Sequence, residues 1–180
     1  MKRNIVAIIG SLCKDSSNIK LVNRIAELTE AFFTITLFQD LADLPHFNPD
    51  IDQDNPPASI ASFRTLIAHA DGVLICTPEY IFSLPSGLKN ALEWCVSTTI
   101  FTEKIVGLIT ASASGEKAHE ELGLIMHTLG ARFNPETTLL IKGIKGKLNA
   151  TGELLDTGIQ YEIECFIQAF AKALNVQNLL

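Results

Sequence analysis

Two uninterrupted apolar segments constrain the fold of this chain more than any other feature. The first, Asn4–Ile9, is apolar from Ile5 onward, and the second is Gly72–Cys76. Both have the length of a strand, and neither shows the apolar–polar alternation of a strand with one face in water. Unbroken apolar strands are typical of parallel sheets that helices cover on both faces, so the chain is predicted to have an α/β fold.

The rest of the chain alternates between segments of strand and helix character. Further strands are predicted at 32–38, 104–110 and 137–141, and apolar residues recur at helical spacing within 19–26, 60–67, 88–95, 118–129 and 159–174. Five strands alternating with five helices predict a flavodoxin-like three-layer sandwich with a five-stranded parallel sheet of order 2-1-3-4-5. The length of 180 residues predicts one domain over residues 1–180.

The segment 39–57 is rich in Asp, Asn and Pro, and is predicted to be mostly irregular. Loops of this length are usually functional or flexible. The triplet Asp50-x-Asp52-x-Asp54 resembles the start of a calcium-binding loop, but Ala61 stands where the bidentate Glu is required. The four histidines and four cysteines show no metal-ligand spacing, so no metal site is predicted, and each Cys is expected to be a small buried side chain.

Composition limits the partners of the chain. A net charge of −6 gives no general attraction to nucleic acid or to anionic membranes. The apolar segment near the N-terminus is too short for a signal sequence or a membrane span, which favours the cytoplasm. The hydrophobic fraction of 47% is high for a chain of this length, and favours burial of apolar surface between subunits.

The segment Gly10–Asn18 joins the first predicted strand to the first helix. Helix N-termini present backbone N–H groups and the positive end of the dipole, which favour an anion. Ser11, Ser16, Ser17 and Asn18 add polar side chains, so the segment suits the phosphate of a mononucleotide. The same residues are also good helix caps, and that reading remains open. GxGxxG and the Walker pattern are absent, so neither a dinucleotide turn nor ATP is indicated.

The segment Thr77–Asn90 follows the apolar strand Gly72–Cys76. Pro78 and Pro85 stiffen it, and it carries a carboxylate, an aromatic ring and a hydroxyl group. It is either a ledge for a planar ligand or an ordinary connection in which Pro85 enters the next helix. The strand order places this segment beside Gly10–Asn18, where ligands bind in open α/β sheets.

Both segments match the pattern of a known family. The motifs are Ile9-Gly10-Ser11-Leu12-x-Lys14-x-Ser16-x-Asn18, Thr77-Pro78-Glu79-Tyr80, Pro85-x-x-Leu88-Lys89-Asn90 and Leu44-Pro45-x-Phe47-Asn48-Pro49-Asp50. Together they resemble the NAD(P)H-dependent FMN reductase family, which includes quinone, azo and chromate reductases. The resemblance implies a flavodoxin-like fold, bound FMN, NAD(P)H as co-substrate, a small-molecule electron acceptor, and a homodimer or homotetramer.

The resemblance also implies roles for individual residues. Ser11, Ser16 and Asn18 would hold the FMN phosphate, with Cys13 and Ser17 in the same loop. The remaining flavin contacts would be Pro78, Glu79, Tyr80 and Ser83 on one side of the ring, and Ser112, Ser114 and Gly115 on the other. The acceptor pocket would be formed by Tyr80, Ile81 and Phe82. No side chain is predicted to act as a catalytic acid or base, because the flavin carries the chemistry.

Several positions depart from the family pattern. Cys13 stands where the family usually has Arg, which removes a fixed cation from the phosphate site and leaves Lys14 as a flexible alternative. Ile81 and Phe82 replace the usual Asn-Tyr, which predicts a more hydrophobic acceptor pocket. Lys142, Lys145 and Lys147 are either a contact for the 2′-phosphate of NADPH or a solvated loop, and the solvated loop is favoured.

The sequence thus supports an FMN-dependent NAD(P)H oxidoreductase that works by ping-pong hydride transfer. Its acceptor would be a quinone, a free flavin, a nitro- or azo-aromatic compound or an oxidised metal ion. A flavin-binding electron carrier or redox sensor without efficient NAD(P)H turnover is the alternative. A third reading is a protein of this shape that does not bind FMN.

Overall fold

Five parallel strands form the central layer of the molecule. A computed structural model describes residues 1–52 and 55–176. The strands are β1 (Arg3–Ile9), β2 (Phe33–Phe38), β3 (Gly72–Thr77), β4 (Ile105–Ser112) and β5 (Thr138–Lys142). Their order is β2-β1-β3-β4-β5, and every neighbouring pair is parallel. The predicted flavodoxin-like fold and strand order are confirmed.

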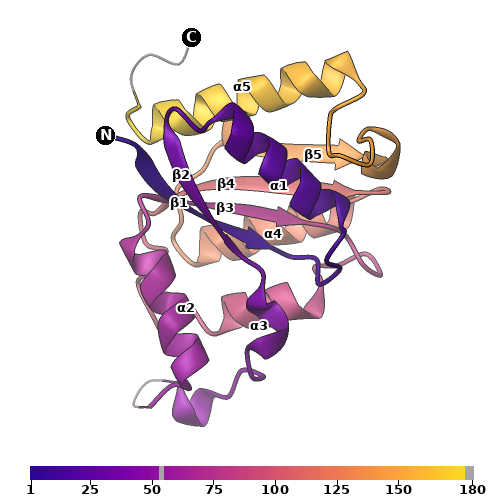
Figure 1. Ribbon diagram of the computed structural model, residues 1–180. Helices are drawn as coiled ribbons and strands as arrows, with labels where there is room; N and C mark the ends of the chain where they lie inside the picture. The colour runs from indigo at the N-terminus through magenta and orange to yellow at the C-terminus, as the bar shows by residue number, and fades with distance from the viewer. Residues whose placement is uncertain (53–54, 177–180) are drawn as a thin grey trace.

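Helices cover both faces of the sheet (Figure 1). One face carries α1 (Ser17–Leu28) and α5 (Thr157–Ala173), and the other carries α2 (Ala58–His69), α3 (Ser86–Glu93) and α4 (Glu116–Thr128). Short 3-10 turns lie in the connections, at η1 (Asp40–Asp43), η2 (Pro49–Ile51), η3 (Pro135–Thr137) and η4 (Ile144–Gly146). Within the described residues, no helix is both long and apolar enough to cross a bilayer.

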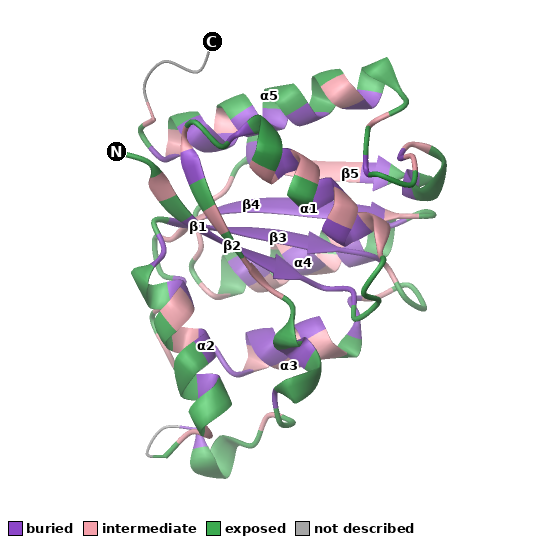
Figure 2. Cartoon of the chain, viewed as in Figure 1, coloured by how far each residue is buried: buried purple, intermediate pink, exposed green. Residues whose placement is uncertain are grey.

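The core consists of two apolar layers, one on each side of the sheet. Along β1, Ile5, Ala7 and Ile9 pack toward α1 and α5, whereas Val6 and Ile8 pack toward α2, α3 and α4. Figure 2 shows the central strands buried and the helices exposed on their outer faces. Burial on both faces explains why the strand sequence shows no alternation.

Two of the four cysteines depart from the expected burial. Cys76 and Cys95 are buried, and burial raises the pKa of Cys95 to about 12. Cys13 and Cys165 are exposed, so the prediction of a buried side chain is wrong for these two. Cys13 lies in the loop between β1 and α1, outside both core layers, and Cys165 lies on the exposed side of α5.

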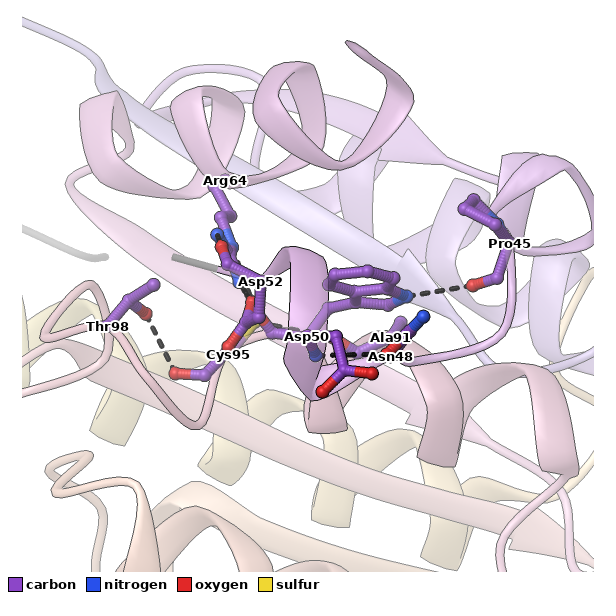
Figure 3. Close-up of polar contacts among 9 residues, drawn as sticks. Pro45, Asn48, Asp50, Asp52, Arg64, Ala91, Cys95 and Thr98 are labelled. Carbon is purple, nitrogen blue, oxygen red and sulfur yellow. Dashed lines mark hydrogen bonds and ion pairs between the residues drawn. The ribbon is translucent and has the colours of Figure 1, made fainter. Parts of the chain in front are cut away.

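Residues 39–52, the first part of the irregular segment between β2 and α2, are called the strap here. The Arg64 guanidinium donates to the Trp94 carbonyl oxygen (Nε–O 2.8 Å), and pairs with the buried carboxylate of Asp52 (Figure 3). The indole Nε1 of Trp94 donates to the Pro45 carbonyl oxygen at 2.8 Å. Asn90 also bonds to Pro45, and accepts from the Phe47 backbone N–H. The strap is therefore fastened to α2 and α3 along its length.

Candidate functional site

A cavity of about 730 Å³ opens at the carboxyl ends of β1, β3, β4 and β5. It is called the cleft here. Its lining residues are Ser11, Cys13, Asp15, Ser16, Ser17, Asn18, Pro78, Glu79, Tyr80, Ala111, Ser112, Ala113, Gly143, Ile144, Lys145 and Gly146. The volume lies within the range of roughly 300–1,000 Å³ found for small-molecule sites. The cleft also has the position at which parallel α/β sheets bind ligands.

Gly10 allows β1 and β3 to approach closely at the base of the cleft. A Cβ atom at this position would lie 2.3 Å from the Thr77 hydroxyl oxygen, closer than real Cβ contacts allow. The Gly10 N–H donates to the Cys76 carbonyl oxygen at 2.8 Å, which continues the strand pairing into the loop. The backbone therefore turns toward α1 directly beside the start of the Pro78 segment.

The loop after Gly10 is held by its own polar side chains. The Ser16 hydroxyl caps α1 by accepting from the Ile19 N–H at 3.2 Å, and the Ser11 hydroxyl accepts from the Cys13 N–H at 3.3 Å. The Asn18 amide donates to the Ala111 carbonyl oxygen at 3.2 Å, which ties α1 to β4. Sequence reasoning left phosphate binding and capping open, and the capping contacts of Ser16 are present. These three hydrogen bonds hold the loop against α1 and β4.

Glu79 connects the β3–α3 segment to α4. Its carboxylate accepts hydrogen bonds from the backbone N–H groups of Gly115 (3.2 Å), Lys117 (2.9 Å) and Ala118 (3.0 Å). Gly115 occupies the N-cap position of α4 and has no side chain with which to cap the helix. A carboxylate from another segment thus satisfies the N–H groups that begin α4 and complements the helix dipole.

Ile81 and Phe82 form the tip of a tight hairpin. Tyr80 and Ser83 exchange two backbone hydrogen bonds of 3.0 and 3.1 Å, and the two residues between them have φ angles of +51° and +58°. Positive φ at both central positions is the pattern of a type I′ turn, which favours Asn and Gly. A β-branched and an aromatic side chain are strained there. Both protrude, with exposed fractions of 95% for Ile81 and 78% for Phe82.

The far side of this hairpin is fastened to the middle of α4. The Glu121 carboxylate accepts from the Ser83 hydroxyl at 2.7 Å and from the Leu84 N–H at 2.9 Å. Together with Glu79, this contact fixes both ends of the hairpin to one helix. The protruding side chains of Ile81 and Phe82 are therefore presented from a rigid base.

The structure brings most of the predicted site residues together. The predicted residues that line the cleft are Ser11, Cys13, Ser16, Ser17, Asn18, Pro78, Glu79, Tyr80 and Ser112. The others lie outside its lining: Ile81, Phe82, Ser83, Ser114 and Gly115. Ser83 is engaged with Glu121, and Gly115 is buried at the start of α4.

The turn Gly143–Gly146 lines the cleft after β5, whereas the sequence suggested only Lys145 of this turn, as a contact for NADPH, and favoured a solvated loop. The strand order contained the signal, because the carboxyl ends of parallel strands share one edge of the sheet. Sequence reasoning missed Asp15, and its carboxylate pairs with Lys20 at 2.9 Å. Of the lysines considered as an NADPH contact, Lys142 pairs with Glu116, and this hydrogen bond holds the pKa of Glu116 below its usual value.

The fold and the cleft together define a flavodoxin-like protein with a site for a mononucleotide cofactor. The cleft combines a hydroxyl-rich loop at a helix N-terminus with the aromatic ring of Tyr80 at its other side. This donor set fits FMN, because a phosphate needs N–H and O–H donors and a flavin ring needs a flat surface. Ser11, Ser17 and Tyr80 are suited to these roles.

Comparison with known proteins identifies the family. Residues 3–145 match the NADPH-dependent FMN reductase family, and the chain belongs to it. It is 30% identical over 177 residues to a 2-hydroxy-1,4-benzoquinone reductase of Burkholderia sp, covering 95% of this chain and 96% of that protein. It is 29% identical over 178 residues to a quinone reductase of Escherichia coli K12, covering 95% of each.

A solved structure supports the same assignment. The flavoenzyme NAD(P)H:(acceptor) oxidoreductase of Paracoccus denitrificans superposes with a TM-score of 0.76 at 25% identity, over 96% of this chain and 97% of that one. The chain is thus an NAD(P)H-dependent oxidoreductase with FMN as cofactor. The predictions of the family, of an enzyme, and of FMN with NAD(P)H are confirmed.

Proposed function

We propose that this protein reduces quinones with NAD(P)H by a ping-pong mechanism. The net reaction is NAD(P)H plus a proton plus a quinone, giving NAD(P)⁺ and a hydroquinone. The observation that carries the proposal is the cleft, in which a hydroxyl-rich loop and an aromatic ledge meet at the edge of the sheet. The names of the two relatives, both quinone reductases, support a quinone as the acceptor.

The protein's contribution in this proposal is positioning. When bound, FMN supplies the two-electron chemistry by accepting a hydride from the nicotinamide and giving it to the acceptor. Ser11, Ser17 and the N–H groups at the start of α1 hold the phosphate end, and Pro78 and Tyr80 support the ring. Because the Glu79 carboxylate is committed to α4, the hairpin stays in place without adding an unpaired charge beside the flavin.

The acceptor pocket is proposed to lie between Tyr80 and the hairpin tip. Tyr80 lines the cleft and is half exposed, and Ile81 and Phe82 extend the apolar surface beyond it. This arrangement favours planar apolar acceptors over charged ones, because a charged acceptor would lose hydration without gaining a partner. Benzoquinones and naphthoquinones satisfy that requirement better than oxidised metal ions.

The test is a pair of kinetic measurements on the FMN-loaded protein. Anaerobic mixing with NADH or NADPH should bleach the flavin absorbance, and subsequent addition of a benzoquinone should restore it. Initial rates at varied concentrations of both substrates should give parallel double-reciprocal lines. Flavin that binds but is not reduced by either nucleotide would favour the electron-carrier alternative, and intersecting lines would exclude ping-pong transfer.

We also propose that the protein is a cytoplasmic homodimer or homotetramer. An apolar cavity of about 360 Å³ between α3 and α4 supports an interface between copies there. Its lining includes Val96 and Leu124, which are 61% and 68% exposed. Light scattering on the purified protein tests this proposal, and Leu124→Glu should shift the mass toward the monomer. A monomeric wild-type protein would contradict it.

A further inference from the structure

In the part of the chain that the structure describes, the charges around the cleft leave one cation available to a ligand. Two acidic residues line the cleft, and both have partners: Asp15 pairs with Lys20, and Glu79 caps α4. Among the described residues, Lys145 is the one lysine or arginine that lines the cleft. Lys14, the cation that the sequence suggested in place of the missing Arg, is not part of the lining.

The turn that carries Lys145 is fixed in position. The Gly143 N–H donates to the carbonyl oxygen of Ala113, a residue of the cleft lining, at 3.2 Å. Gly143 has a φ angle of +65°, which a residue without a side chain adopts without strain. The next residue, Ile144, is buried in the core. The Gly146 N–H donates to the Gly143 carbonyl oxygen at 3.0 Å, so the Cα of Lys145 is held at the cleft between Ile144 and Gly146.

The same turn lies on the α1 side of the sheet. Ile144 and Leu148 belong to the core layer that also contains Ile19 of α1, and Gly152 lies against Lys20 of that helix. Tyr80, in contrast, belongs to the segment that leads into α3 on the opposite face. The buried part of this turn therefore lies on the α1 side of the sheet, the side on which Ser16 and Ser17 begin α1.

We propose that Lys145 is the cation that binds the FMN phosphate in this chain. A phosphate monoester carries a charge of about −2 near pH 7, and the protein itself carries a net charge of −6. Cys13 supplies no positive charge at the family's usual Arg position, so the charge comes from the turn after β5. Lys145 is a binding residue in this role and does not touch the reacting atoms.

The test compares FMN with riboflavin, which has the same ring but no phosphate. Fluorescence titrations of Lys145→Gln at low salt should show a dissociation constant for FMN raised about tenfold. The constant for riboflavin should stay within about twofold of the wild-type value. The tenfold difference should shrink as potassium chloride is added, because salt screens exposed charges. Lys147→Gln, two residues along the same turn and outside the cleft lining, is the matched control and should bind both ligands as the wild type does.

Three results would overturn the assignment. The first is an FMN dissociation constant within twofold of the wild type in Lys145→Gln. The second is an equal loss of FMN and riboflavin, which would mean that the substitution alters the turn itself. The third is an effect seen only as a raised KM for NADPH relative to NADH, which would assign Lys145 to the 2′-phosphate of the nucleotide. The titrations need no turnover, so they distinguish failure of this inference from failure of the proposed quinone reductase activity, on whose cofactor the inference rests.

Discussion

The cleft and the strap use their polar loop residues in two different ways. In the strap, the buried carboxylate of Asp52 pairs with Arg64, and Pro45 accepts hydrogen bonds from both Trp94 and Asn90. In the cleft, Ser17 and Lys145 line an open volume of about 730 Å³. The strap is rich in Asp, and the segment Gly10–Asn18 of the cleft is rich in Ser. The polar groups of the strap bond to residues of α2 and α3, whereas the cleft presents some of its polar groups to a ligand.

The difference shows that polar composition alone does not identify a binding loop. Asp50-x-Asp52-x-Asp54 looks more like a ligand site than Gly143–Gly146 does, yet Asp52 has a structural role and the glycine turn lines the cleft. The two regions differ in whether their polar groups already have hydrogen-bond partners within the protein. Substitutions in the strap should therefore affect stability, and substitutions in the cleft should affect ligand binding.

The largest expected effect comes from Arg64→Met in the strap. The substitution leaves the Asp52 carboxylate buried without its partner, and should lower the free energy of unfolding by about 3–5 kcal/mol. Urea titration measures this loss. Arg24→Met removes an exposed pair with Glu27 and should change stability by less than about 0.5 kcal/mol. Equal unfolding midpoints for the two variants would contradict the structural role of the strap.

Glu79→Ala should have a smaller effect on stability and a clear effect on the cleft. It removes the cap of α4 and should cost about 1–2 kcal/mol by urea titration. FMN affinity should fall as well, because the hairpin beside the flavin loses one of its two attachments to α4. Glu120→Ala on the outer face of α4 is the control. Unchanged FMN affinity in Glu79→Ala would show that the cap of α4 does not support FMN binding in the cleft.

Substitutions at the hairpin tip are expected to raise the stability of the protein, not to lower it. Replacing Ile81 by Asn and Phe82 by Gly removes two strained positive φ positions, and should raise stability by about 1 kcal/mol. The KM for an apolar quinone should rise, since the proposed acceptor pocket loses its apolar surface, while FMN affinity should not change. Leu155→Asn removes another exposed apolar side chain and is the control. A destabilised double variant would show that the tip is not strained.

The smallest expected effect concerns His119, whose imidazole Nδ1 lies 3.0 Å from the Thr110 hydroxyl. Partial burial holds the pKa of His119 below its ordinary value of 6.5. The unfolded chain therefore takes up this proton first, so stability should fall as the pH drops below 6.5 and should be unaffected above it. Urea midpoints between pH 8 and pH 5 should fall less for His119→Gln than for the wild type. Parallel pH profiles would contradict this.

The sequence predicts the strands and helices well, because both follow from the pattern of apolar residues along the chain. The unbroken apolar runs Ile5–Ile9 and Gly72–Cys76 are typical of parallel strands covered on both faces, and the alternation of strands and helices with the length of the chain favours the observed sheet order. The two loops of the cleft follow from the same order. Their family motifs lie at the carboxyl ends of β1 and β3, where the structure places them.

The remaining features depend on contacts that no local pattern reveals. Asp52 and Arg64 are 12 residues apart and meet because of how the strap folds over α2. Glu79 and Ala118 are 39 residues apart, so the cap on α4 is invisible to motif analysis, which assigned Glu79 to the flavin alone. Lys145 was predicted to lie in a solvated loop, because a single lysine in a polar loop forms no motif, although the strand order places its turn at the same edge of the sheet as the cleft.

A crystal structure of the protein with FMN tests the central claim most directly. The account predicts the phosphate between the segment Gly10–Asn18 and the turn Gly143–Gly146, with the ring along Pro78 and Tyr80 and the strap unchanged. Flavin bound instead in the cavity of about 530 Å³ between β5 and α5, beside Tyr161 and Cys165, would contradict it. So would a complex in which the phosphate lies on the strap.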